Sequence, residues 1–288
     1  MKNSNKAISA ALLSMISVQG GASIAKQLFP AIGATGTSVL RIGLSAAFLT
    51  IINRPKFSAF TKQQWKYCAI YGIGIAAMNL IFYLAIQRIP LGLAVTVEFI
   101  GPLFLALSLS RKWIDVLWGL LACVGILLIV PWQSNDIDLI GLLLAFLAGI
   151  FWALYIVMGG KVTSVMQGKD AVTTGMLFAT LIIIPFAIWD GGVFQLTPIL
   201  FLKGLGVAIL SSALPFSLDL VALKRIPAKT FSILTSLQPA FAALSGLIFL
   251  SETLTLMQWT SVACVISASI GATLFSNRKK QKTSSSSS

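Results

Sequence analysis

The chain has 288 residues, of which 57% are apolar and only 10% are charged, and its formal net charge is +13. A soluble domain carries roughly a quarter charged residues, so this composition excludes an ordinary soluble protein and indicates a polytopic membrane protein. The positive charge does not indicate nucleic-acid binding, because Lys and Arg gather in short segments between apolar runs, as they do in cytoplasmic loops of membrane proteins. The absence of His and the wide separation of the three Cys argue against a metal site, a metal cofactor or a disulfide framework.

Apolar runs long enough to cross a bilayer follow one another along the whole chain. A spanning helix needs about 20 mostly apolar residues. With the N-terminus in the cytoplasm, most of the 21 Lys and Arg residues fall into cytoplasmic loops or the C-terminal tail, which also ends in the cytoplasm. The sequence therefore predicts an all-α fold with ten transmembrane helices at residues 7–28, 35–53, 66–87, 91–110, 113–132, 138–160, 170–189, 198–222, 229–250 and 257–276.

The two halves of the chain resemble each other. Residues 88–90 and 225–227 share the sequence Arg-Ile-Pro, and further matches of Pro, Phe and Trp follow in register. We predict a first five-span repeat at 1–135, a second at 136–277, and a basic, serine-rich cytoplasmic tail at 278–288. Because five is odd, the second repeat enters the membrane with inverted topology. Inverted repeats are typical of transporters that expose a site near the bilayer midplane to either side in turn.

Glu98 and Arg41 are the most informative charged residues inside the predicted spans. A charge at the centre of a spanning helix costs about 2.5–3.5 kcal/mol, so such residues are usually functional. The two side chains are predicted to share a depth in the membrane. In one interpretation Glu98 faces an ammonium group or takes up a proton while Arg41 faces a carboxylate. In the other, the two form a buried salt bridge that holds spans 2 and 4 together.

Three amide side chains are candidates for the same site, namely Gln19 in span 1, Asn79 in span 3 and Gln238 in span 9. An amide can bind either end of an amino acid, because it both donates and accepts hydrogen bonds. Amides also hold membrane helices together, and the sequence leaves both roles open.

Prolines interrupt several of the predicted spans and are candidates for gates or bends. In span 4 we expect Gly101 and Pro102 to break the helix just after Glu98. The full set of candidate helix breaks is Pro90, Pro102, Pro215, Pro227 and Pro239.

Four other charged residues lie near span ends and carry weaker functional predictions. Asp219, a secondary candidate, is close enough to basic neighbours for a structural role. Lys203 and Lys26 lie near outer span ends, where a long side chain can extend to the membrane surface. Glu252, the other secondary candidate, falls at the outer end of span 9, where we expect it to fix a helix end or a loop.

Residues 249–255, Phe-Leu-Ser-Glu-Thr-Leu-Thr, look like the G-E-x-L-T signature of the drug/metabolite transporter superfamily in its EamA-domain branch, with Ser251 in place of Gly. Arg41 is similar to the Arg that this family carries in its second span. Residues 17–26, 90–92, 98–102 and 213–219 resemble the threonine and homoserine exporters within that branch. The resemblance covers nearly the whole chain.

The resemblance implies a bacterial inner-membrane secondary exporter of small amino acids, threonine or homoserine first, driven by the proton gradient through alternating access. It implies a transporter rather than an enzyme, without a cofactor, whose partners are the amino acid, protons and the lipid bilayer. The alternatives are a carrier of another metabolite or drug with the same architecture, and a membrane sensor or scaffold without transport. ATP-driven transport is disfavoured because the sequence contains no Gly-rich phosphate loop.

Overall fold

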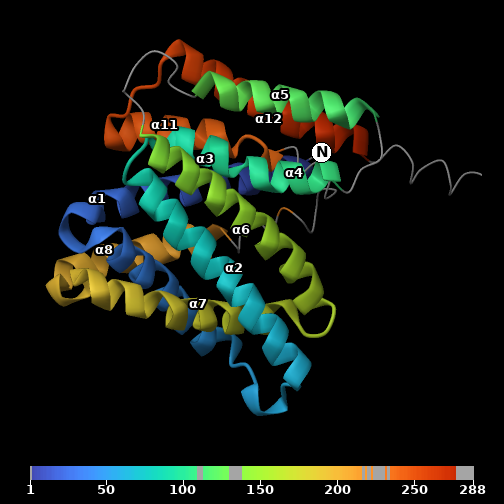
Figure 1. The fold of residues 1–288 in the computed structure, drawn as a ribbon. Coiled ribbons are helices and arrows are strands. Elements are labelled where there is room, and N and C mark those ends of the chain that lie inside the picture. The colour runs from blue at the N-terminus through green and yellow to red at the C-terminus, as the bar shows by residue number, and fades with distance from the viewer. Residues whose placement is uncertain are drawn as a thin grey trace, which may run out of the picture.

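A computed structural model describes residues 2–108, 113–129, 138–215 and 234–276, together with Leu218, Ala222 and Phe231 (Figure 1). Every regular element in these residues is helical, which confirms the all-α prediction for this part of the chain. The elements are α1 (Lys2–Asn53), η1 (Phe57–Ala59), α2 (Lys62–Ile86), α3 (Leu91–Glu98), α4 (Ile100–Ser108), α5 (Trp113–Ile129), α6 (Leu139–Thr163), α7 (Gly168–Asp190), η2 (Gly192–Gln195), α8 (Pro198–Ala208), η3 (Ile209–Ala213), α11 (Gln238–Leu250) and α12 (Leu256–Ser276).

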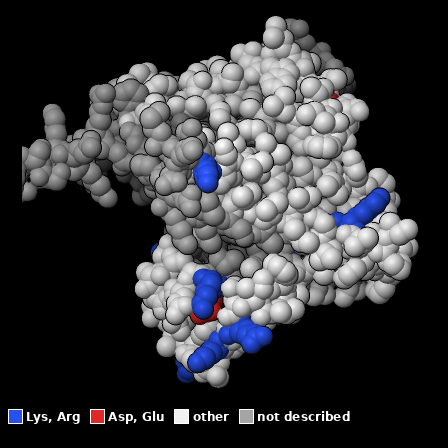
Figure 2. Space-filling view, turned by 180° about the vertical axis from the view of Figure 1, so that it is seen from behind, with Lys and Arg blue, Asp and Glu red and all other residues white. Residues whose placement is uncertain are grey.

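Much of the surface is apolar. Within the described residues, five helices are long and apolar enough to cross a membrane, and four shorter apolar helices accompany them. Many large apolar side chains are exposed, among them Trp189 at 94% and Trp113 at 88%. The face shown in Figure 2 is almost free of charged groups, and Lys and Arg gather near its lower end. A surface of this kind is typical of a protein that contacts lipid rather than water.

A single glycine separates the two spans predicted at 7–28 and 35–53. The structure has one element there, α1, but Gly33 adopts φ 71° and ψ 170°, which is not helical. Glycine tolerates this conformation because it has no Cβ. A Cβ at Gly33 would also lie 2.6 Å from Oδ2 of Asp190. The hydroxyl of Thr35 donates a hydrogen bond to the same carboxylate, so the break is held against the end of α7.

The helix of span 4 is interrupted just after Glu98, as predicted, although Gly101 and Pro102 themselves lie inside the helix that follows. α3 ends at Glu98 and α4 begins at Ile100. Proline has no N–H, so Pro102 cannot donate the helical hydrogen bond to the carbonyl four residues before it, which belongs to Glu98. The loss of that bond falls at Glu98 itself, and the carboxylate-bearing residue therefore ends a helix.

α3 and α4 are wedged between α6 and α11. A Cβ at Gly101 would lie 1.9 Å from the carbonyl oxygen of Gly149 in α6, and one at Gly92 would lie 2.6 Å from Cα of Ala243 in α11. All eight residues of α3 are buried. The main hydrophobic cluster joins α3 to α1, α2, α6 and α11 through Leu28, Tyr83, Leu93, Ala145 and Ala242. This close packing of α3 and α4 fixes Glu98 in the interior of the bundle.

An ion pair joins the end of α2 to the start of α6. Nη1 of Arg88 lies 2.7 Å from Oδ2 of Asp138. The other carboxylate oxygen of Asp138 accepts hydrogen bonds from the backbone amides of Ile140 and Gly141 and caps α6. The hydrogen bond from Arg88 lowers the pKa of the Asp138 carboxyl below its ordinary value, and the two amides act in the same direction.

The depressed pKa of Asp138 predicts a pH-dependent contribution to stability. A carboxyl group whose pKa is lowered in the folded state stabilises the fold above its unfolded pKa, and this contribution disappears as the pH falls through its folded pKa. We expect Asp138→Asn to lower the apparent melting temperature in detergent slightly at pH 7, because Asn keeps the cap but loses the ion pair. The difference from wild type should vanish below the ordinary aspartate range. A difference that persists well below that range would contradict this account.

Candidate functional site

The five polar residues predicted as a site line one cavity of about 210 Å³. They come from α1, α2, α3 and α11, which are far apart in sequence, and they are Gln19, Arg41, Asn79, Glu98 and Gln238. The rest of the wall is mostly apolar and aromatic: Val18, Ala22, Met78, Phe82, Val95, Trp152 and Tyr155. A largely apolar cavity with a few convergent polar groups is the usual form of a small-molecule site.

Glu98 is 8% exposed and occupies the last position of α3. Ion pairs within the described part of the chain join Lys26 to Glu252 and Arg88 to Asp138, so the predicted alternative of a salt bridge between Glu98 and Arg41 is not found there. The backbone of Glu98 rests on Gly149, where an added Cβ would lie 2.5 Å from the Glu98 carbonyl oxygen. A buried carboxylate on a fixed backbone is a strong candidate for binding a cation or a proton.

Arg41 is oriented by Tyr83, a fully buried residue of α2. Nη1 of Arg41 donates a hydrogen bond of 3.2 Å to the phenolic oxygen, and Cζ lies 5.5 Å from the centre of the ring. A guanidinium has five N–H donors, and this contact uses one of them. Arg41 therefore combines a fixed position with donors that can still bind a carboxylate in the cavity.

The amide side chains complete the polar lining. Nδ2 of Asn79 donates to the carbonyl of Ile75 in its own helix at 2.8 Å, so its Oδ1 remains an acceptor. Gln19 is 3% exposed, and Gln238 is the first residue of α11. Within the residues that the structure describes, neither glutamine side chain forms a hydrogen bond to another part of the protein. These amides can therefore bind a polar ligand without breaking contacts within the protein.

A second cavity of about 540 Å³ adjoins the first. Trp152, Tyr155 and Gln238 belong to the walls of both cavities, so the two meet at these side chains. The second wall adds the hydroxyl-bearing residues Thr235, Ser269 and Thr273 together with Phe99, Pro102, Leu103, Ile156, Phe231 and Ala272.

The predicted helix breaks have different local roles. Pro90 is the residue before α3, and Pro239 lies in the first turn of α11, where a missing N–H breaks no helical bond. Pro215 cannot donate to the carbonyl of Ser211, and the preceding turn is the π-helix η3. Pro227 lies outside the described residues, as do the secondary candidate Asp219 and the tail 278–288.

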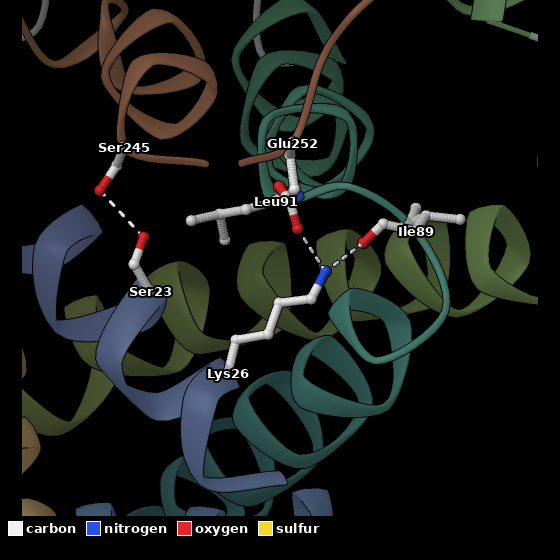
Figure 3. A network of polar contacts seen from close by, with 6 residues as sticks. All are labelled: Ser23, Lys26, Ile89, Leu91, Ser245 and Glu252. Atoms are coloured by element: carbon white, nitrogen blue, oxygen red, sulfur yellow. Dashed lines mark hydrogen bonds and ion pairs between the residues drawn. The ribbon is translucent and has the colours of Figure 1, made fainter. Parts of the chain in front are cut away.

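Glu252 and Lys26 form a network that the sequence did not predict (Figure 3). Nζ of Lys26 lies 2.6 Å from Oε1 of Glu252 and donates to the carbonyl of Ile89 at 2.9 Å. The other oxygen of Glu252 accepts a hydrogen bond of 2.7 Å from the backbone amide of Leu91. Glu252 thus fixes a helix end, as expected. The expectation that Lys26 extends to the membrane surface was wrong, because its partners lie inside the bundle.

Among the described residues, no three His, Cys, Asp or Glu side chains come together in a way that could hold a metal ion. The polar groups of the first cavity are one carboxylate, one guanidinium and three amides, beside the indole of Trp152 and the phenol of Tyr155. These groups can bind and release a zwitterion or a proton.

Comparison with known proteins identifies the family. Residues 139–274 match the EamA-like transporter family. The chain is 43% identical to the threonine/homoserine exporter RhtA of Escherichia coli (strain K12), over 94% of this chain and 92% of that protein. The chain belongs to the EamA-like transporter family. Membership places it among membrane transporters rather than enzymes, as the sequence predicted.

Other relatives of this EamA-like transporter agree with that assignment. RhtA of Salmonella typhimurium (strain SL1344) is also 43% identical over 94% of the chain and 92% of its own length. The uncharacterized inner membrane transporter YicL of Salmonella typhimurium (strain LT2) is 26% identical over 72% of each sequence. A solved crystal structure shares the fold with a TM-score of 0.59 at 16% identity, covering 96% of this chain and 98% of its own.

Proposed function

We propose that this protein is a secondary exporter of small amino acids in the bacterial inner membrane, with threonine and homoserine as the first candidate substrates. The relatives that are 43% identical carry the name threonine/homoserine exporter, and the similarity extends over nearly the whole chain. In this proposal the protein is driven by the proton gradient, and its partners are the amino acid, protons and the surrounding lipid.

The observation that carries the proposal is the polar lining of the 210 Å³ cavity. An amino acid brings an ammonium group and a carboxylate into the site. Glu98 is the only carboxylate in the described wall of this cavity and faces the ammonium, while the guanidinium of Arg41 binds the carboxylate through charge-assisted hydrogen bonds. Gln19, Asn79 and Gln238 are left to bind the side-chain hydroxyl that threonine and homoserine share.

Glu98 also supplies the proposed coupling to protons. A carboxylate in a membrane interior binds either a proton or a cationic group, and it cannot serve both at the same time. Competition between a proton from outside and the ammonium group of the substrate then links their movements in opposite directions. Export follows when the proton gradient drives the exchange.

The proposed topology is ten spans in two inverted five-span repeats, at 1–135 and 136–277, with both termini in the cytoplasm. Polar contacts at the two ends of α1, α2, α6 and α7 support it. At one end, Gln64 donates to the carbonyl of Val165 and Asn53 donates to Thr173. At the other end, Arg88 pairs with Asp138. The first of these ends is the basic one, and its exposed basic residues are Arg54, Lys56, Lys62, Lys66, Lys161 and Lys169.

Efflux of labelled threonine and homoserine from proteoliposomes that contain the purified protein tests the proposal. We expect efflux that is faster with an imposed pH gradient than without one, and competition between the two amino acids. Empty liposomes and a gradient collapsed by a protonophore are the controls. Folded, inserted protein that moves neither amino acid would contradict the proposed substrates.

A further inference from the structure

Lys26 and Glu252 hold a short stretch of backbone that neither of them belongs to. Their network also includes the carbonyl of Ile89 and the amide of Leu91, the two peptide groups on either side of Pro90 (Figure 3). Leu91 is the first residue of α3, so its amide has no partner inside that helix. A carboxylate at this position also interacts favourably with the positive end of the helix dipole. The ion pair therefore holds the N-terminus of α3.

The segments around the network are packed to allow this contact. A Cβ at Gly246 would lie 2.5 Å from Oε2 of Glu252, so a larger residue here would force the carboxylate to move. The amide of Glu252 donates to the carbonyl of the same glycine and closes the end of α11. Beside the network, the hydroxyls of Ser23 in α1 and Ser245 in α11 lie 3.0 Å apart. α1, α3 and α11 are thus joined at one place by groups that can separate without breaking a helix.

Three helices connect this network to the cavities. α3 begins at the network with Leu91 and ends at Glu98 in the first cavity. α11 begins at Gln238, which lines both cavities, and ends beside the network. α12 begins a few residues after Glu252, and its distal part carries Ser269 and Thr273, which line the second cavity. The network and the larger cavity therefore lie on opposite sides of Glu98.

We propose that Lys26 and Glu252 close the substrate pathway at the end remote from the larger cavity, and that their separation releases α3 so that Glu98 becomes accessible from that end. Both are positioning residues, because they act on Glu98 through α3. The proposal rests on the proposed transport function and adds the group that separates one state from the other. The pair is partly buried, with side chains 20% and 14% exposed, and in this proposal water reaches the site from that end only after the pair opens.

A thiol reporter tests the closure without measuring transport. Ala22 lies on α1 between Gln19 and Lys26 and lines the first cavity at 4% exposed. In a background with the three native cysteines replaced, Ala22→Cys is treated with a membrane-impermeant thiol reagent, using vesicles of both orientations. We expect Lys26→Met and Glu252→Gln each to raise the rate of labelling from the network side about tenfold, equivalent to ~1.4 kcal/mol.

The ion pair between Arg88 and Asp138 provides a matched control. Arg88→Gln and Asp138→Asn remove a contact of similar length that touches neither cavity, so we expect unchanged labelling. Equal labelling in the Lys26 and Glu252 variants and in wild type would overturn the proposal, whatever solute the protein carries. If labelling rises but no threonine moves in wild type, the closure stands and the proposed substrate fails.

A crosslink provides an independent measurement that does not depend on the stability of the ion-pair variants. Ser23→Cys combined with Ser245→Cys places two thiols beside the closed network. We expect an oxidant to join them, to abolish labelling of Ala22→Cys from the network side and to stop efflux of threonine, and a reductant to restore both. Full efflux from crosslinked protein would show that this end does not open.

Discussion

Glu98→Gln is expected to remove the dependence of export on the pH gradient while leaving the protein folded. Gln has nearly the same shape as Glu but neither a negative charge nor an ionisable proton, so it can occupy the cavity without taking part in proton exchange. We expect the fold to tolerate the loss of the charge, because Glu98 forms no ion pair with other described residues. A loss of gradient-driven efflux of at least ~10-fold corresponds to about 1.4 kcal/mol.

Gradient-driven efflux and exchange without a gradient together show whether Glu98 binds only the proton or also the ammonium group of the substrate. If Glu98 binds only the proton, exchange of labelled for unlabelled threonine without a gradient continues in Glu98→Gln. If it also binds the ammonium group, exchange falls as well. Thr96→Val is the matched control, because Thr96 lies on α3 and is fully buried, but its hydroxyl bonds to the carbonyl of Gly92 in the same helix. Gradient-driven efflux at the wild-type rate in Glu98→Gln would refute its assignment.

The extent of the long helices could be predicted from the sequence because it depends on local properties. Apolar runs set the lengths, and the spans predicted at 66–87 and 138–160 correspond to α2 at Lys62–Ile86 and α6 at Leu139–Thr163. The breaks could be predicted less well. Whether a helix stops at Gly33 or continues depends on a neighbour, Asp190, that is distant in sequence.

The candidate cavity was partly predictable for a different reason. Polar groups are costly inside a membrane, so the few that occur there are usually needed, and those selected on this basis line one cavity. The same reasoning failed for Lys26. Near a span end a lysine can reach the surface at little cost, and only the folded chain shows that Glu252 lies within its reach.

α3 and α4 cross α6 so closely that a single added methyl group is expected to reduce both stability and transport. Gly149→Ala is expected to destabilise the protein, because its new methyl group would lie 2.5 Å from the carbonyl oxygen of Glu98, where it meets backbone rather than a movable side chain. Overpacking of this kind typically costs about 1–3 kcal/mol. The structure can relieve the clash only by moving α3 and α4 away from α6, which displaces Glu98 from the cavity. We therefore expect both a lower apparent melting temperature in detergent and slower efflux of threonine.

Gly160→Ala is the matched control on the same helix. Gly160 is exposed, and a Cβ there meets no atom within 4 Å. Alanine is favoured over glycine inside a helix by roughly 0.8–1.0 kcal/mol, so this variant should be as stable as wild type or more stable. The difference between the two melting temperatures measures the cost of the clash with α3, because the general preference of helices for alanine applies to both variants. Equal melting temperatures for Gly149→Ala and Gly160→Ala would show that α3 and α4 can separate from α6 at little cost, and Glu98 would then not be held by this contact.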